Sequence, residues 1–538
     1  MCQLKKQLLP SAEQARLFTY DEPTMPLIRL NRNTSYPLRS VAATRRIEQV
    51  VAAQLAPHTL MQRAGLAVAR LACALAPHAQ TIWLACGPGN NGGDGLEAAM
   101  HLKLWGRDPM VTWLGDESRC PTDALQSLER ARETGVTFLA EPPAEYDFAI
   151  DALLGIGQTK PMVGVMADWL LHMQQTAPAV LCVDVPSGLN ADTGTYFESK
   201  IAINNIADKA VNTPARSKKA PIFCLSLLTL KPGLFTAQGK DAAGEVWFDD
   251  LDLDLENNPF ESPTAWLLGA DCASLPARLH ASHKGTFGDV VVVGGAVGMT
   301  GAALLAARAA LHAGAGRVFV ALLDANTADD AGQRMTVDAM QPELMFRSLE
   351  TLALRDQTVV CGCGGGDAVR HVLSQILSQA PRLVLDADAL NAIATDSSLQ
   401  TLLKARSKCS LQTILTPHPL EAARLLGMSA AQVQGDRLAA AQTLANRFGS
   451  VVIVKGAGSV IAAPGQLPFI NGSGNAKLAT AGTGDVLAGL VGALLAAGHE
   501  SFFAASTAAY AHGQAADHCP VGQALTASEL VKLLSLET

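Results

Sequence analysis

The sequence predicts an α/β protein built from two three-layer α/β/α domains. Short apolar runs with strand character alternate with helical segments in both halves of the chain, which is typical of parallel sheets covered by helices. The length of 538 residues exceeds what one hydrophobic core ordinarily organises, so two domains are expected. Abundant alanine and glycine, with only 5% aromatic residues, suit helices packed closely on sheets.

The first domain is expected to follow an irregular, polar and proline-bearing extension over residues 1–39. Apolar residues with helical spacing then run from Ser40 to Leu75. The strand candidates of this domain are Thr81–Cys86, Met110–Leu114, Phe148–Ile150 and Val180–Val185.

An acidic stretch from Asp249 to Ser262 changes the composition, so the predicted domains are 40–250 and 262–538. The glycine-rich loops of the two halves differ and no internal repeat is visible, which indicates that two different α/β domains are joined. The strand candidates of the second domain are Val290–Val293, Val318–Ala321, Thr358–Cys361, Leu383–Leu385, Thr413–Leu415 and Val451–Val454.

Charge and hydropathy exclude several classes of protein. The formal net charge of −8 argues against a general nucleic-acid binder, which needs a basic face for phosphates. Met1–Leu30 has no sustained apolar core, so no secretory signal is expected. The apolar stretch Leu478–Gly498 is broken by Asp485 and glycines, which argues against a membrane span. We expect a cytoplasmic protein without nucleic-acid or membrane partners.

The 11 cysteines are scattered and lack paired CxxC spacing, in keeping with a reduced compartment. Cys361 and Cys363 flank one glycine inside a glycine-rich turn. A zinc or redox role is compatible with that spacing, but small residues accepted in a loop are the favoured interpretation.

A glycine-rich run, Cys86–Gly95 (CGPGNNGGDG), follows a strand candidate and precedes a helical segment. Its glycines allow the backbone to approach a ligand, and the helix that follows directs N–H groups at an anion such as pyrophosphate. A simple glycine turn is the alternative. Two asparagines and an aspartate among these glycines favour a binding site.

Two carboxylates follow other strand candidates of this domain. Asp151 opens DALLGIG and Asp184 lies in VDVPSGLN. Taken singly, Asp151 also fits a helix cap and Asp184 a turn residue. Because ligands bind at the carboxyl edge of an open parallel sheet, three polar strand ends in one domain predict a joint site there.

GNNGGDG, DALLGIG and VDVPSGLN occur in the order found in the NAD(P)H-hydrate epimerase family, and this half of the chain resembles that family. Leu60–Gly65 (LMQRAG) also resembles the family's opening helix. The resemblance implies a Rossmann-like domain. By that resemblance the hydrate contacts are Asn90, Asn91, Gly92, Gly93, Asp94, Gly155, Ile156, Gly157, Gln158, Thr159, Lys160, Pro161 and Asp184.

The same resemblance implies a potassium ion held by Asn91, Asp151 and Ser187, and oxygen ligands suit such a hard cation. We hypothesise that Asp184 handles a proton while the C6 stereocentre of the hydrate is opened and reformed. The polar, partly basic stretch Tyr196–Lys219 departs from the family, and an exposed insertion is the favoured interpretation.

The second domain carries the densest motif, Asn475–Gly489 (NAKLATAGTGDVLAG). A glycine-threonine turn leads directly into an apolar helix, whose free N–H groups and dipole form an anion hole for a phosphoryl group. Asp485 lies in the first turn, where a carboxylate can accept a hydroxyl proton. An acidic cap would explain Asp485 but not the turn. No Walker P-loop is present.

Val454-Lys455-Gly456-Ala457-Gly458-Ser459 ends a strand candidate and predicts a nucleotide contact. Lys455 also fits a solvated loop lysine. His418, taken alone, fits an ordinary surface histidine, but within TPHPLE at a strand end it favours substrate contact.

Together with the Thr480–Asp485 loop, four segments make Ser262–Thr538 similar to the ribokinase-like NAD(P)H-hydrate dehydratase family. The resemblance implies hydrate contacts by Ala302, Gly364, His418 and Asp485, and nucleotide contacts by Lys455, Gly456, Ala457, Gly458, Ser459 and Gly484. Gly362–Gly366 (GCGGG) departs from the family's GPGLG at Cys363 and Gly365. The four segments are Lys284–Gly288, Gly294–Ala302, Asp386–Asn391 and Thr416–Glu421.

The two resemblances imply a repair enzyme for hydrated NADH and NADPH. Phosphorylation of the C6 hydroxyl makes a good leaving group, and elimination restores the dihydronicotinamide; the dehydratase takes the S hydrate and the epimerase returns the R hydrate to it. The loops resemble the ADP-using type, so ADP, or else ATP, is the expected co-substrate, accompanied by Mg²⁺. A homo-oligomer is also expected.

Two other functions compete with this prediction. A small-molecule kinase of the hydroxymethylpyrimidine or thiazole class shares the anion hole but leaves the first domain's motifs unexplained. A non-catalytic binding module is the other alternative for the first domain, and the presence of Asp151, Asp184 and the GNNGGDG run argues against it.

Overall fold

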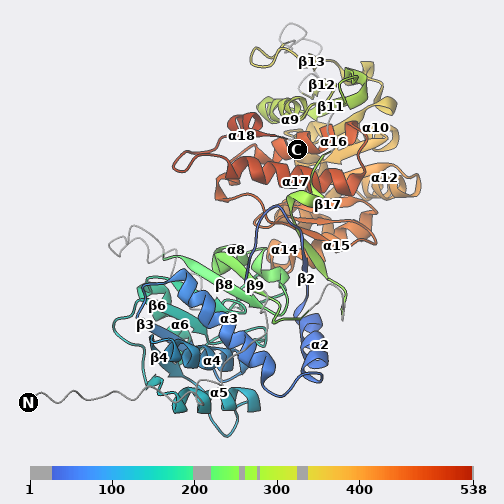
Figure 1. Cartoon of the computed structure of the whole chain (residues 1–538). Coiled ribbons are helices and arrows are strands. Elements are labelled where there is room, and N and C mark those ends of the chain that lie inside the picture. Colours follow the sequence, from blue (N-terminus) through green and yellow to red (C-terminus); the bar gives the residue numbers. More distant parts are fainter. Residues whose placement is uncertain (1–26, 198–219, 254–260, 276–278, 324–336, 536–538) are drawn as a thin grey trace, which may run out of the picture.

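The computed structural model describes residues 27–197, 220–253, 261–275, 279–323 and 337–535. These residues form two lobes, each built around its own sheet (Figure 1). Most of the stretch Tyr196–Lys219 that departs from the family lies outside the described residues.

The first sheet has the strand order β1-β9-β8-β7-β6-β3-β4-β5, and every neighbouring pair is parallel except β1 with β9. The order reverses between β3 and β6, which creates the crevice where open α/β sheets bind ligands. Its strands are β1 (Ile28–Arg29), β3 (Thr81–Cys86), β4 (Asp108–Trp113), β5 (Thr137–Leu139), β6 (Phe148–Ala152), β7 (Val180–Val183), β8 (Ile222–Leu227) and β9 (Glu245–Asp249).

Helices cover both faces of this sheet because its strand residues alternate between two apolar layers. Ile82 and Leu84 share one core with α2 to α5, whereas Trp83 shares another with α6 and α8. The helices are α2 (Val41–Ala52), α3 (Thr59–Leu75), α4 (Asn90–Leu104), α5 (Thr122–Glu133), α6 (Val165–Thr176) and α8 (Gly239–Ala243).

The second sheet has the order β13-β12-β11-β14-β15-β16-β17-β18-β19-β10-β2 and is parallel from β13 to β17. Its order reverses between β11 and β14. Its strands are β2 (Tyr36–Leu38), β10 (Ala265–Leu268), β11 (Asp289–Gly294), β12 (Arg317–Leu322), β13 (Met345–Phe346), β14 (Thr358–Cys361), β15 (Arg382–Leu385), β16 (Gln412–Leu415), β17 (Val451–Val454), β18 (Val460–Ala462) and β19 (Phe469–Asn471).

Strand residues of this sheet also alternate between two cores. Val290 and Val292 pack with α9, α16 and α17, whereas Val291 and Val293 pack with α10 to α13 and α15. The helices are α9 (Thr300–His312), α10 (Arg370–Gln379), α11 (Ala387–Thr395), α12 (Ser397–Lys408), α13 (Pro419–Leu426), α14 (Ala430–Gly435), α15 (Arg437–Phe448), α16 (Thr483–Ala496), α17 (Ser501–Asp517) and α18 (Ala527–Leu533). The predicted pair of three-layer α/β/α domains is therefore confirmed.

The extension over residues 1–39 was predicted to be irregular, but its described part contains two short strands. Ile28–Arg29 pairs with β9 in the first sheet, and Tyr36–Leu38 pairs with β10 in the second. Both are short edge strands stabilised by pairing with distant strands, which a local apolar pattern does not reveal. Leu38 is fully buried in a core that contains residues of both lobes, so this segment joins them.

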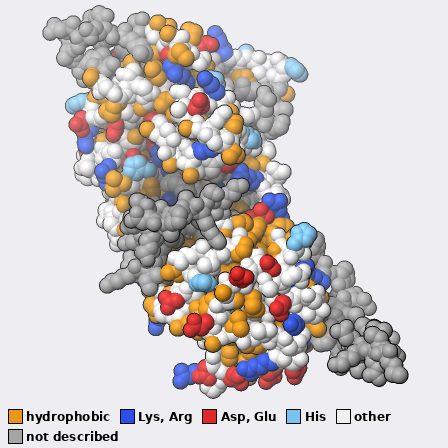
Figure 2. All heavy atoms as spheres, turned by 90° about the vertical axis from the view of Figure 1, so that its left-hand side faces the viewer, with side chains coloured by type: hydrophobic (Ala, Val, Ile, Leu, Met, Phe, Trp, Pro, Cys, Tyr) orange, Lys and Arg blue, Asp and Glu red, His pale blue; other side chains and the backbone are white. Residues whose placement is uncertain are grey.

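No helix within the described ranges is both long and apolar enough to cross a membrane. On the face drawn in Figure 2, acidic and basic side chains are interspersed over both lobes.

Candidate active sites

The first candidate site begins where β3 ends and α4 starts. Gly92 lies so close to the Gly87 carbonyl that any side chain there would overlap it, so these glycines bring the start of α4 against the strand end. Asn91 follows the first residue of α4, and its buried Nδ2 has no hydrogen-bond partner in the structure. The run is therefore a tight strand-to-helix turn with an unsatisfied donor at the sheet edge.

Asp184 follows β7 at the same edge. Its φ of +66° lies in the left-handed region, which costs energy for a residue with a side chain and so indicates a backbone held by its surroundings. One carboxylate oxygen forms an ion pair with Lys231, and the other accepts from the Ile156 amide at 3.3 Å.

Lys231 is a site residue that the sequence interpretation did not single out. Its side chain is fully buried, and its Nζ also donates to the Leu227 carbonyl at 2.7 Å. The available signal was a single charged residue within the mostly apolar run Leu228–Leu234, directly after a strand. A buried lysine needs an anionic partner, and Asp184 supplies it.

Two further carboxylates face this pair. Burial and the negative charges of Asp184, Glu48 and Glu97 raise the pKa of Asp94 well above its usual range. Burial and the charge of Asp184 also raise the pKa of Glu48. Glu48 comes from α2 and was not predicted as a site residue. Asp184, Asp94 and Glu48 therefore all lie near one cation, the ammonium group of Lys231.

Asp151 and Ser187 lie together, as the predicted potassium set requires. Ser187 Oγ donates to Asp151 Oδ1 at 2.6 Å and the Ser187 amide to Asp151 Oδ2 at 3.0 Å. Burial raises the pKa of Asp151, despite these bonds from Ser187. A buried carboxylate that keeps only neutral partners is the kind of ligand that a hard cation would stabilise, so the donor set fits potassium.

The loop after β6 connects these groups. A methyl group added at Gly155 would come within 2.8 Å of Asn91 Oδ1 and 3.2 Å of Asp184 Oδ2, so three predicted contacts converge there. Gln158 Oε1 accepts from the Gly188 amide at 2.9 Å, which ties the loop to the turn after Asp184. Residues 159–161, at the end of the predicted hydrate loop, are exposed.

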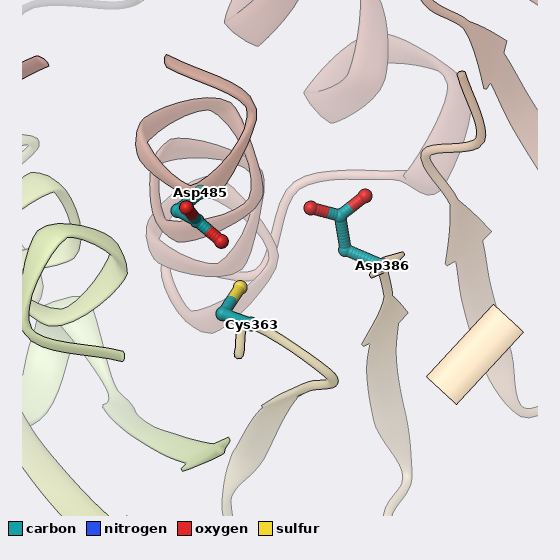
Figure 3. Close-up of side chains that lie close together, drawn as sticks. All are labelled: Cys363, Asp386 and Asp485. Atoms are coloured by element: carbon teal, nitrogen blue, oxygen red, sulfur yellow. The ribbon is translucent and has the colours of Figure 1, made fainter. Parts of the chain in front are cut away.

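The second candidate site lies at the start of α16. Asp485 stands in the first turn of this helix, after Gly482 with φ +90°. The amides of a first turn lack acceptors within the helix, so they are available to an anion. Figure 3 shows the Asp485 carboxylate facing Cys363 and Asp386, and the ligand atoms of these three residues lie within 4.8 Å of one another.

Asp386 was predicted only as part of a motif, yet it is central to this site. It follows β15, is 2% exposed, and accepts from Lys455 Nζ at 2.6 Å and from Thr416 Oγ1 at 2.8 Å. Lys455 is therefore not a solvated loop lysine. Although burial acts to lower the pKa of Lys455, the carboxylates of Asp386 and Glu421 raise it overall.

Within the part of the chain that the structure describes, no lysine or arginine forms an ion pair with Asp485, although the charge of Lys455 acts to lower its pKa. Burial and the negative charge of Asp386 raise the pKa of Asp485 to about 7, while a hydrogen bond from Cys363 acts in the opposite direction. Burial raises the pKa of the Cys363 thiol well above its usual range, so this thiol stays protonated as a donor. A carboxyl that titrates near neutral pH is suited to general-base work.

His418 caps α13 instead of standing free. Its Nδ1 accepts from the Leu420 amide at 3.1 Å, and the Glu421 carboxylate lies 3.2 Å from its Nε2. Burial raises the pKa of Glu421 to about 7. Burial and nearby Lys455 lower the pKa of His418, so a neutral imidazole with one partly exposed edge adjoins the site.

Two predicted hydrate contacts, Ala302 and Gly364, meet at the switch point between β11 and β14. Gly364 has φ +58°, and a side chain there would approach the Met299 carbonyl and the Ala302 methyl at 2.6 and 2.9 Å. The glycines of GCGGG thus bring two loops into contact, although Cys363 and Gly365 depart from the family pattern.

The predicted nucleotide loop Lys455–Ser459 follows β17 beside Gly484. A methyl group added at Gly484 would lie 3.2 Å from Lys455 Nζ. Gly456, with φ +140°, packs against the buried Arg437 guanidinium, whose Nη2 donates to the Lys455 carbonyl at 3.1 Å. Gly458 instead contacts the first domain.

Two α/β/α domains, each with polar groups at the switch point of its sheet, define a two-domain enzyme. One site offers an anion-binding helix start with a base that titrates near pH 7, which suits phosphoryl transfer; the other offers several acids around one lysine, which suits proton transfer.

Comparison with known proteins identifies the family. The family model described as YjeF-related protein N-terminus matches residues 57–211, and the model described as NAD(P)H-hydrate dehydratase matches residues 290–535. The chain is 34% identical over 479 residues to the bifunctional NAD(P)H-hydrate repair enzyme Nnr of Escherichia coli (strain K12), covering 86% of this chain and 85% of that protein.

Two further relatives match the second domain. The ADP-dependent (S)-NAD(P)H-hydrate dehydratase of Neisseria meningitidis serogroup B (strain ATCC BAA-335 / MC58) is 46% identical over 247 residues, which cover 45% of this chain and 80% of that protein. A crystal structure of ADP/ATP-dependent NAD(P)H-hydrate dehydratase from Bacillus subtilis, co-crystallised with ATP/Mg²⁺, is 28% identical with a TM-score of 0.40, covering 49% of this chain and 93% of that one.

The chain belongs to the family of bifunctional NAD(P)H-hydrate repair enzymes. The predictions of the family, of a bifunctional enzyme and of its repair function are confirmed by these relatives.

Proposed function

We propose that the second domain dehydrates the S hydrate of NADH and NADPH with ADP as co-substrate, and that the first domain interconverts the R and S hydrates. The observation that carries the proposal is the arrangement at the start of α16: Asp485, with a pKa of about 7, stands beside Asp386 and Lys455 at an anion-binding helix start. The relative named ADP-dependent supports ADP.

In the dehydratase reaction, Asp485 takes the proton of the C6 hydroxyl, and the hydroxyl oxygen attacks the terminal phosphoryl group. The bond from that phosphorus to the bridging oxygen breaks, and AMP leaves. The first-turn amides of α16 stabilise the charge on the migrating group. Elimination then expels inorganic phosphate from C6 and a proton from C5, which restores the double bond. Gly484 and the nucleotide loop Lys455–Ser459 hold the nucleotide, while Ala302, Gly364 and His418 hold the hydrate.

Mg²⁺ is expected to accompany the nucleotide, and it would neutralise phosphate charge. The oxygen donors of the site fit such an ion, since Asp386 keeps one carboxylate oxygen beyond the one that binds Lys455. The rest of the site acts through the chain's own groups: Lys455 holds Asp386 in place, and Asp386 raises the pKa of the base.

In the epimerase reaction, Asp184 accepts and returns a proton as C6 is opened and reformed, and Lys231 keeps that carboxylate oriented. Asn91, Gly155 and Ile156 line the hydrate beside it. Potassium, where bound by Asn91, Asp151 and Ser187, would supply positive charge next to the anionic parts of the substrate.

The assembly of this protein into a homo-oligomer, expected from its sequence, stays a prediction.

One assay tests the whole proposal. The purified protein receives a mixture of the two hydrate epimers with ADP or ATP supplied separately, and reduced-nicotinamide absorbance and inorganic phosphate are followed. We expect ADP-dependent recovery of absorbance, one phosphate per nicotinamide, and consumption of both epimers. A stable phosphorylated product without phosphate release would indicate a small-molecule kinase instead.

A further inference from the structure

A segment of the first domain runs from the first active site to the second domain. It starts at Lys231, which pairs with Asp184, and ends at Lys240. Between them, Thr236 and Ala237 contact the nucleotide loop. We call Lys231–Lys240 the linking segment.

The contact with the nucleotide loop is formed by a backbone amide and a buried hydroxyl group. The Ala237 amide donates to the Ala457 carbonyl at 3.1 Å, and the fully buried Thr236 donates through Oγ1 to the Gly458 carbonyl at 3.1 Å. Gly458 has φ +61°, and any side chain there would overlap the Phe235 carbonyl oxygen. The backbone of the nucleotide loop therefore packs directly against the first domain.

The linking segment also holds the chain that leads to α16. Lys240 Nζ donates to the carbonyls of Gly472 and Gly474, at 3.0 and 2.7 Å. From Gly474 the chain continues through the short helix Ala476–Leu478 to Gly482, after which α16 begins with Asp485 in its first turn. The first domain thus donates hydrogen bonds to the nucleotide loop and to the segment that precedes α16.

On its other side the linking segment is fixed to the body of the first domain. The Gln238 amide donates to the Gly194 carbonyl at 2.9 Å, and the Gly233 amide donates to the Ala191 carbonyl at 2.7 Å. The linking segment is therefore held by the first domain on one side and hydrogen-bonded to the nucleotide loop on the other, so it can fix the position of that loop.

We infer that the first domain positions the nucleotide loop through Thr236 and Ala237, and the segment that leads to α16 through Lys240, so that the nucleotide site of the dehydratase is completed by the epimerase domain. The inference rests on the proposed role of Lys455–Ser459. These three residues are positioning residues, since they act on the nucleotide only through the segments that they hold. Without these contacts the nucleotide loop must become ordered when the nucleotide binds. The entropic cost of that ordering weakens binding without changing the chemical step.

The test compares Thr236→Val with Thr134→Val in the full chain. Both variants remove a threonine hydroxyl of the first domain that donates to backbone carbonyls. Thr236 donates to Ala457 and Gly458 of the nucleotide loop, whereas Thr134 donates to Arg130 at the end of α5. For Thr236→Val we expect the KM for ADP to rise about 3- to 10-fold, with kcat and the KM for the hydrate within twofold of the parent. Lys240→Met should act in the same direction, and Thr134→Val should leave all three constants unchanged.

Epimerase activity and circular dichroism of each variant report whether the chain is folded. An unchanged KM for ADP in folded Thr236→Val and Lys240→Met proteins would overturn the inference. An equal loss in Thr134→Val would also overturn it, because the effect would then be general destabilisation. Failure of the proposed function looks different: the parent protein itself would show no nucleotide-dependent dehydration.

Discussion

The two active sites place their aspartates differently relative to a lysine. In the first site, Lys231 pairs directly with Asp184. In the second, Lys455 pairs with Asp386, and Asp485 is left beside that carboxylate with a pKa of about 7. In both sites, burial and the lysine-paired carboxylate raise the pKa of a neighbouring acid, Asp94 in the first and Asp485 in the second. The proposed base is the lysine-paired carboxylate in the first site and the neighbouring acid in the second.

The largest effect is expected from a substitution that inactivates the first site and leaves the second site intact. Asp184→Asn keeps the shape of the side chain but removes the proton acceptor, so we expect epimerisation to fall by about 10³-fold. Dehydration of the S hydrate should continue at the parent rate and stop when that epimer is exhausted. Chiral separation of the remaining hydrate measures this, and full epimerisation by the variant would exclude the role of Asp184.

Removing the lysine tests whether the ion pair of the first site is needed. Lys231→Met leaves Asp184 without its cation, and we expect an epimerase loss of about 100-fold and a decrease of about 3 kcal/mol in the free energy of unfolding. Urea denaturation measures the second quantity. Lys103→Met is the matched control, because it breaks an exposed pair with Asp108 and should change stability by less than about 1 kcal/mol. Equal effects in the two variants would contradict the account.

The pH dependence of dehydration tests the raised pKa of Asp485 in the second site. The ionised form of Asp485 is the active base, and its pKa is raised to about 7. The dehydration rate at saturating substrate should therefore rise about tenfold per pH unit below that value and level off above it. A rate that stays flat from about pH 5.5 to 8.5 would show that Asp485 does not titrate there.

The smallest expected effect concerns Cys363, whose thiol lies beside the Asp485 carboxylate. The thiol donates to Asp485 and thereby lowers its pKa. Cys363→Ala should move the inflexion of the rate profile upward by less than about one pH unit, whereas Cys363→Ser keeps a donor and should leave it near the parent value. A downward shift in the alanine variant would contradict this role for the thiol.

Much of the fold follows from local patterns. The buried strands β3, β14 and β17 coincide with predicted apolar runs, because strands covered on both faces are nearly continuously apolar. Gly87 and Gly362 directly follow β3 and β14, and Lys455 and Gly456 follow β17. The short strands β18 and β19 were not predicted, since a run of three residues is too short for a reliable local pattern.

The candidate sites were predicted less completely than the fold. Asp151, Asp184 and Asp485 stand out because each lies at the end of an element: Asp151 in the last residues of β6, Asp184 directly after β7, and Asp485 in the first turn of α16. Lys231 is far from Asp184 in sequence, and only the adjacency of β7 and β8 brings them together. The contact of Thr236 with Gly458 depends on how two domains pack, which a single sequence does not specify.

The most direct test of the account is Asp485→Asn in the full chain, given both hydrate epimers and ADP. We predict that nicotinamide recovery and phosphate release fall by about 10³-fold, while the two epimers still interconvert at the parent rate. Dehydration at more than about a tenth of the parent rate would contradict the assignment of Asp485 as the base that receives the hydroxyl proton.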